Sequence, residues 1–444
     1  MAGIPDEIDT ANQPPMAVPL RHFVVGIGLL VLGGCVGLGV ALGWLAGLAT
    51  LAHAHLLLVG WVCVTIMGAM TQFVPVWSGV PLHSRRLATW QLWFVTVGLL
   101  GFVAGLLTGR LWVTVPFGAV MLLGFWTFVY NLGRTLWALP TYDVTERHFG
   151  VALGFFLLVT AFGVVLAIDF VEPVVGRFQV TRVAVVQTHA TLAVFGAVLT
   201  TILGALYQLA TMFTQTELHG IDRWLRRVET VGYPVGVVAL AGGRLLGSAP
   251  AATVGGLLVV LSLLGFGVIL ARRLSETRVP WTPMLRRYAV AAPALVLWGL
   301  LTLPAWIADP LRPTVTLGAP GTVHLLGLGV IGFVVFGTLY HVVPFIIWVH
   351  RYSDRLGFEQ VPMIDDLYSG RVARADFALL VAGTGWLVTA DWVAAFPAPA
   401  WGGGVLLVAG AGLFAANVLL IMYRHGPAEL LFGRLPVPIV EHDP

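Results

Sequence analysis

Apolar runs of about 20 residues or more follow one another along almost the whole chain, and short polar segments separate them. A helix needs about 20 residues to cross a hydrocarbon core roughly 30 Å thick, so each run is long enough for one transmembrane helix. The pattern therefore predicts an all-α polytopic membrane protein with twelve transmembrane helices. They cover approximately residues 22–49, 52–77, 87–108, 111–138, 148–171, 181–213, 230–248, 251–271, 286–308, 319–349, 375–396 and 401–423.

The composition supports the same class of protein. Of 444 residues, 58% are hydrophobic and 10% are charged, whereas about 25% of the residues in an average soluble domain are charged. A water-soluble globular fold is thereby excluded. The 24 basic and 21 acidic residues leave a net charge of +3. Charge that is so dilute and so balanced argues against a nucleic-acid partner, and the partner that the composition indicates is the lipid bilayer.

The basic residues, which are all arginines, predict the orientation of the chain. With the N-terminus inside, nineteen of the 24 arginines fall on the cytoplasmic side and five on the outer side. Basic residues in short loops stay on the cytoplasmic side of a membrane. We therefore expect a multi-pass protein of a prokaryotic cell (plasma) membrane, with cytoplasmic tails at 1–21 and 425–444 and a single membrane domain at 22–424.

The second, sixth and tenth predicted helices resemble one another. Residues 53–75 and 189–211, which are 136 positions apart, share ten identities in 23 positions. The segment 324–344 matches the first of these at a shift of 269. The shared positions include two glycines of each helix, Gly60/Gly196/Gly329 and Gly68/Gly204/Gly337. The comparison predicts three repeats of four helices at about 22–138, 148–271 and 286–423, in pseudo-symmetric arcs.

Histidines near the outer ends of these three helices are the candidate site. His55 and His324 occupy equivalent repeat positions, which suits two axial ligands of one low-spin, bis-His haem b. Each could instead bond a neighbouring carbonyl as a packing contact. His53 lies about 200° from His55 around the helix, and it becomes the ligand if His55 is not. His189 is the repeat equivalent of His53, so these two histidines could flank a second site for a metal or another haem.

Other ionisable residues receive no functional role from the sequence. Seven further histidines, among them His22 and His148, lie at predicted helix ends, in loops or in the tail, and are expected to be interfacial. The acids at membrane depth are expected near the outer helix ends: Asp169, Glu172, Asp309 and Asp391. This distribution argues against a proton channel built from buried carboxylates.

Residues of the tenth helix resemble a motif of a known family. Gly337, His341 and Pro344 follow His324 in the register found in subunit I of the haem–copper oxidase superfamily, especially in C-type cytochrome oxidases and nitric oxide reductases. The resemblance implies twelve helices in three arcs of four, with metal ligands on the second, sixth, seventh and tenth helices. It also implies that His324 is a low-spin haem ligand and that His55 or His53 is its partner.

The sequence departs from this family at three ligand groups. Thr322 stands where the family has its high-spin haem ligand, the seventh helix has no histidine, and Thr191 stands at the copper-ligand position of the sixth helix. The resemblance therefore implies no copper, and whether the protein is an enzyme stays open.

The function that this comparison implies is electron transfer, or redox chemistry of nitrogen oxides or oxygen. The alternatives are a non-enzymatic transporter or haem- or metal-handling factor, or a protein of nitric-oxide sensing or tolerance, on the same scaffold. An electron-donor protein or second subunit is the expected protein partner, and the polar connection 351–374 is a candidate docking segment.

Overall fold

The computed structural model describes residues 14–393, 399–427 and 430, and this part of the chain is helical without a β-strand. Of the two predicted tails, residues 1–13 and most of 425–444 lie outside the described residues. The first helix begins at Ala17, inside the predicted N-terminal tail. The helices that run uninterrupted are α1 (Ala17–Ala41), α4 (Arg85–Thr108), α5 (Thr114–Trp137), α6 (Val144–Asp169), α9 (Ile221–Leu245), α10 (Ala249–Ser275), α11 (Pro283–Ala308), α13 (Gly370–Trp392) and α14 (Ala400–His425).

Three further spans are composite, because each contains an eight-residue π-helical segment. The first is α2 (Ala49–His55), η2 (Leu56–Cys63) and α3 (Val64–Ser78). The second is α7 (Arg182–Thr191), η5 (Leu192–Leu199) and α8 (Thr200–Thr214), and the third is η7 (Leu325–Gly332) and α12 (Phe333–Arg351). The π segments begin at residues 56, 192 and 325, and these positions differ by the shifts that align the three sequences. Because π-helix is rare and frequently marks functional sites, its recurrence at equivalent positions supports a common origin of the three spans.

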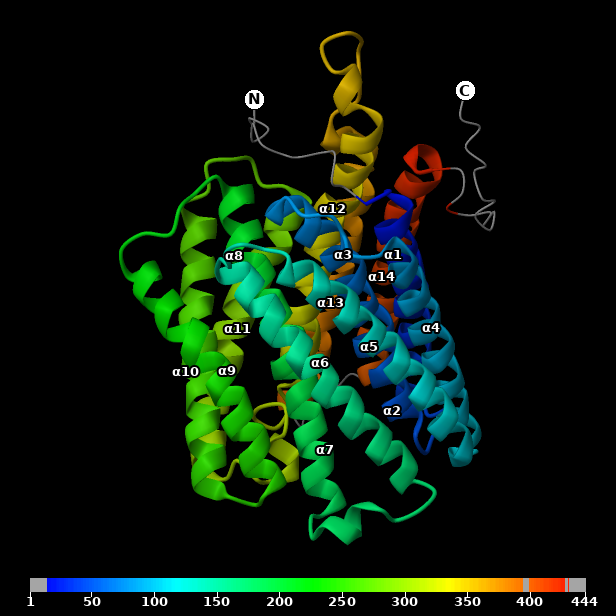
Figure 1. Ribbon diagram of the computed structural model, residues 1–444, viewed down its shortest axis with the longest axis vertical. Coiled ribbons are helices and arrows are strands. Elements are labelled where there is room, and N and C mark those ends of the chain that lie inside the picture. The colour runs from blue at the N-terminus through cyan, green and yellow to red at the C-terminus, as the bar shows by residue number, and fades with distance from the viewer. Residues whose placement is uncertain (1–13, 394–398, 428–429, 431–444) are drawn as a thin grey trace.

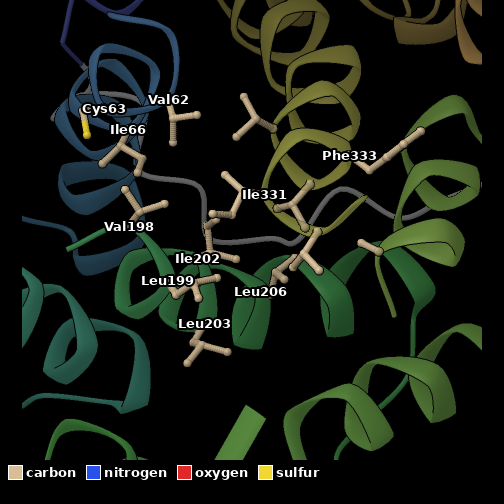
Figure 2. Packing of buried hydrophobic residues seen from close by; sticks show 14 of the residues in the cluster. Val62, Cys63, Ile66, Val198, Leu199, Ile202, Leu203, Leu206, Ile331 and Phe333 are labelled. Atoms are coloured by element: carbon tan, nitrogen blue, oxygen red, sulfur yellow. The ribbon is translucent and has the colours of Figure 1, made fainter. Parts of the chain in front are cut away.

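The same three spans form the centre of the molecule. In the most apolar stretch of each, 78%, 83% and 83% of the residues are buried, against 28–61% in the other apolar helices of the described chain. Figure 2 shows where they meet: Cys63 and Ile66 from the first span, Val198 and Ile202 from the second and Ile331 from the third surround one apolar core. A helix that is buried on all sides must be apolar all round, which explains the even hydrophobicity of their sequences.

The nine uninterrupted helices in the described part of the chain surround this centre. Each contacts the next in the order α1, α4, α5, α6, α9, α10, α11, α13 and α14, and α14 closes the ring against α1. In Figure 1, α2 and α7 lie at the opposite end of the bundle from the labels of α3 and α8, so the composite spans run along its long axis. We call the end at which α1 begins and α3, α8 and α12 finish the N-side, and the other end the far side.

Local signals explain where several helices begin on the N-side. Ser84 caps α4 by accepting a hydrogen bond from the Leu87 amide, and Thr282 caps α11 by accepting one from the Leu285 amide. Asp143 and Glu146 form a capping box at the start of α6. Such side chains supply acceptors for amides that have no partner within the helix.

Eleven spans in the described chain are long and apolar enough to cross a membrane. The prediction of an all-helical, multi-pass membrane protein is therefore confirmed. The remaining helix, α9, begins at Ile221, about nine residues before the apolar run predicted at 230–248, and its first turns carry Asp222, Arg223 and Arg226. Hydropathy locates only the apolar part of such a helix, and the charged turns that precede it become visible only in the structure.

Candidate functional site

Four histidines lie in the far-side half of the three central spans. His53 and His55 are in α2, His189 is near the end of α7, and His324 directly precedes η7. All four side chains are half-buried. The structure thus brings histidines from three distant parts of the chain to the same end of the bundle.

His53 and His189 make the same contacts in two repeats. The His53 Nδ1 bonds the Gly33 carbonyl of α1 at 2.8 Å, and the His189 Nδ1 bonds the Val159 carbonyl of α6 at 3.0 Å. The His53 ring also lies against Gly37, where a Cβ atom would come within 2.4 Å of the ring. Only glycine leaves room for the imidazole there, so α1 is shaped to hold this ring in place.

His324 has a carboxylate partner that the sequence did not reveal. Its Nδ1 bonds Asp391 Oδ2 of α13 at 2.7 Å, and the two side chains are 35% and 26% exposed. The sequence placed Asp391 near the far end of its helix without connecting it to a histidine. Histidines that bind a metal commonly donate their second ring nitrogen to a carboxylate or a carbonyl, so Asp391 is suited to orient His324.

The four histidines fall into two pairs. The His53 ring interacts electrostatically with the His324 ring, and the His189 ring interacts in the same way with the His55 ring. His55 also bonds the Leu51 carbonyl through Nδ1 at 2.8 Å and packs on Phe102, with ring centroids 5.0 Å apart. The structure therefore favours His53, the alternative to His55, as the neighbour of His324.

The hydrogen bonds also fix which ring nitrogen is free. A carbonyl or carboxylate oxygen only accepts, so each Nδ1 must carry a hydrogen and donate it. In the neutral ring this leaves a lone pair on Nε2, and in the described part of the chain none of the four Nε2 atoms has a hydrogen-bond partner. All four rings thus have the form in which imidazole ligates a metal.

The positions at which the sequence departs from the oxidase pattern have structural partners. Thr322 bonds the Ala319 carbonyl at 2.7 Å, and Thr191 accepts a bond from buried Arg244 at 2.7 Å. No group of three or more His, Cys, Asp or Glu side chains suited to a metal ion occurs among the described residues.

A second set of polar residues, which the sequence analysis missed, lies buried towards the N-side. His22, His148 and Arg287, from the first helix of each repeat, are 1%, 4% and 0% exposed. They contact Gln91, Glu229 and Asp376, which come from the third helix of each repeat and are 0%, 1% and 0% exposed. The expectations that His22 and His148 are interfacial, and that buried carboxylates are lacking, are therefore wrong.

The three polar contacts share one geometry. Each first-helix side chain bonds the carbonyl four residues earlier, at 2.8 Å from His22, 2.7 Å from His148 and 2.9 Å from Arg287. Each also packs on the second shared glycine of the central span, where an added Cβ atom would lie 2.6, 2.6 and 3.1 Å from its own Cβ. The sequence signal for these sites was the glycine alignment of Gly68, Gly204 and Gly337.

Comparison with models of known protein families and with curated protein sequences found no match for this chain.

Proposed function

We propose that this protein binds a low-spin haem b between His53 and His324 and works in electron transfer or in nitrogen-oxide or oxygen redox chemistry. The observation that carries the proposal is that two histidines from different central spans, at the same end of the bundle, are each anchored through Nδ1 with Nε2 unpartnered, and that they interact electrostatically. A haem iron with two imidazole ligands has no open position and supplies one-electron transfer.

The residues around the pair fit this cofactor. The Gly33 carbonyl and the Asp391 carboxylate hold the two rings in the correct protonation form, and Gly37 leaves space beside His53. Between the same two central spans, the buried indole nitrogen of Trp61 has no hydrogen-bond partner, and its ring lies 4.6 Å from that of Phe336. An unsatisfied buried donor calls for an explanation, and a polar group of a bound cofactor supplies one.

The scaffold supports the proposal through its resemblance to subunit I of the haem–copper oxidases. Three central spans with equivalent π segments and a ring of nine described helices are compatible with twelve helices in three arcs of four. We propose the same membrane and orientation as above, with both termini cytoplasmic in a prokaryotic plasma membrane. An electron-donor protein or second subunit would dock on the N-side, at the connection 351–374.

His55 and His189 form a second imidazole pair, and we propose that it takes another haem or a metal ion rather than copper of the oxidase type. His53 and His55 of α2 face different neighbours, because residues two positions apart on a helix point about 200° apart. One helix would thereby contribute a ligand to each of two adjacent sites.

The test is a reduced-minus-oxidised spectrum of the purified protein, together with iron and haem quantification. We expect a b-type spectrum that is lost in His53→Ala and in His324→Ala. It should be kept in His83→Ala, a loop histidine that serves as the matched control. Asp391→Asn should retain part of the haem, because it keeps an acceptor for His324 without the charge.

Three outcomes would contradict different parts of the proposal. A purified protein without b-type absorbance would exclude the cofactor and favour a transporter or an assembly factor. A spectrum that survives His53→Ala but not His55→Ala would move the ligand to His55. One haem per chain in wild type and in His189→Ala would exclude a haem at the second pair.

A further inference from the structure

Glu229, His148 and Tyr207 form a buried cluster where α6, α8 and α9 meet, and we call it the Glu229 cluster. The His148 Nε2 lies 3.0 Å from Glu229 Oε1, and the Tyr207 hydroxyl donates to Glu229 Oε2 at 2.8 Å. His148, Glu229 and Tyr207 are only 4%, 1% and 5% exposed. Ionisable groups buried at membrane depth are costly, and such groups frequently serve in ion or proton pathways.

The hydrogen bonds of this cluster are compatible with a proton held between His148 and Glu229. His148 Nδ1 donates to the Val144 carbonyl, so its Nε2 faces the carboxylate. Because Tyr207 donates to the other carboxylate oxygen, one proton is shared between His148 Nε2 and Glu229 Oε1. That proton can reside on either partner, and the cluster can release it or take up another.

A pocket near the N-side surface is lined by one member of this cluster, Tyr207. Its volume is about 520 Å³, and Tyr207 lines it together with Gln208, Thr211 and Arg226. Gln215, Glu217 and Arg223 also line the pocket and are exposed. Tyr207 therefore both lines this pocket and bonds the buried carboxylate.

The groups that face Glu229 come from three helices. His148 lies on α6 and Tyr207 on α8, and α9 itself contributes Tyr233 and, beyond Tyr207, Arg226. Among these groups in the described chain, only His148 and Glu229 have ordinary pKa values below 8. These two groups are therefore the candidate proton acceptors of the cluster near neutral pH.

We propose that the Glu229 cluster is a proton-binding site that exchanges protons with water on the N-side through Tyr207 and this pocket. In the uptake step, a hydronium ion in the pocket gives a proton to the Tyr207 oxygen while the tyrosine hydroxyl proton passes to Glu229 Oε2. The hydronium becomes water, the tyrosine is regenerated and the carboxylate becomes a carboxylic acid. No electron is transferred, so the step is independent of any haem.

The experiment follows the carboxylic-acid C=O stretch by infrared spectroscopy on the purified full-length protein during pH titration and after transfer to D₂O. We expect a titrating band that disappears in Glu229→Gln. The matched control is Glu276→Gln, which alters an exposed His–Glu pair on the same side, with His219 Nε2 2.8 Å from Glu276 Oε2. This control should keep the band.

The route through Tyr207 has its own test. Tyr207→Phe should keep the band but slow its exchange in D₂O by about tenfold or more, because a positioned acid–base group typically contributes at least that much to proton transfer. Tyr340→Phe, the equivalent change in the third repeat, should not slow it.

Three results would overturn the proposal. An infrared band that is unchanged in Glu229→Gln would show that Glu229 is not the proton-binding group. Exchange in D₂O that is as fast in Tyr207→Phe as in the wild type would show that Tyr207 is not on the proton route. If Glu229→Gln does not accumulate, His148→Gln replaces it. Loss of the partner imidazole should let the acid band persist to higher pH, and an unchanged titration would contradict the assignment.

Discussion

The second and third repeats place a buried acid at the same point of the fold but give it different partners. In the second repeat, Glu229 meets His148, whose charge can change near neutral pH. In the third, Asp376 meets Arg287, whose charge is permanent. Each acid also accepts a hydrogen bond from a tyrosine three residues after the shared glycine, Tyr207 or Tyr340.

The surroundings of the two tyrosines also differ between the repeats. Tyr207 lines a pocket that reaches the N-side surface. Tyr340 is instead enclosed by Phe414, Tyr368 and Asn417, and Asn417 donates a hydrogen bond to its hydroxyl at 3.0 Å. Equivalent positions of two repeats thus carry different pairs. The third repeat has a fixed ion pair in a closed environment, and the second has a titratable pair next to a pocket. From this comparison we infer that the Arg287–Asp376 pair is structural and that the His148–Glu229 pair exchanges protons.

The largest effect is expected for Asp376→Leu. It leaves the guanidinium of Arg287 buried without its carboxylate, and breaking a buried ion pair in this way typically costs about 3–5 kcal/mol. Thermal unfolding in detergent measures the loss. The double variant Arg287→Leu/Asp376→Leu is the control, and it should recover most of the stability. A double variant as unstable as the single one would show that the ion pair is not the cause.

A smaller loss is expected for Glu229→Leu. His148 can become neutral when its partner is removed, so the main cost is the lost acceptor of the Tyr207 hydroxyl, about 1–3 kcal/mol. The same unfolding assay applies, with Glu229→Gln as the milder variant. A loss equal to that of Asp376→Leu would mean that His148 is held as a permanent cation, and the contrast between the two repeats would fail.

The smallest effect is expected for Gln91→Leu in the first repeat. The contact between the Gln91 and His22 side-chain nitrogens is long, at 3.4 Å, and the Gln91 side-chain oxygen is buried without a partner. Removing a weak hydrogen bond together with an unsatisfied acceptor should change stability by less than about 1 kcal/mol. A large loss of stability would show that the Gln91–His22 contact of the first repeat contributes as much to stability as the charged contacts of the other two repeats.

Much of the fold could be predicted from hydropathy, whereas the buried clusters could not. The apolar runs predicted the helices, and the alignment of Gly68, Gly204 and Gly337 selected the three spans that form the centre. Glu229 and Asp376 were missed because α9 and α13 begin about nine and five residues before the apolar runs predicted for them. Both acids lie next to a predicted boundary, whereas the helix that carries each of them begins several residues earlier.

The sequence predicted that the four candidate histidines lie at one end of the bundle, but it did not predict which rings are neighbours. The sequence identified His53, His55, His189 and His324, since histidine is rare in apolar helices and these occur at related repeat positions. It could not decide which ring faces which neighbour. That depends on the rotation of each helix, on the π segments that change this rotation locally, and on acceptors such as the Gly33 carbonyl and Asp391, which come from other helices.

The sequence by itself determined the class of protein, the approximate helices and the threefold relation among the central spans. These properties follow from local hydrophobicity and from self-similarity, which need no knowledge of distant contacts. Only the tertiary structure decided that His53 interacts with His324, that His55 interacts with His189, and that Glu229 is buried next to His148. The reason is physical: the cost of burying a polar group depends on the partner it meets, and here each partner comes from another helix.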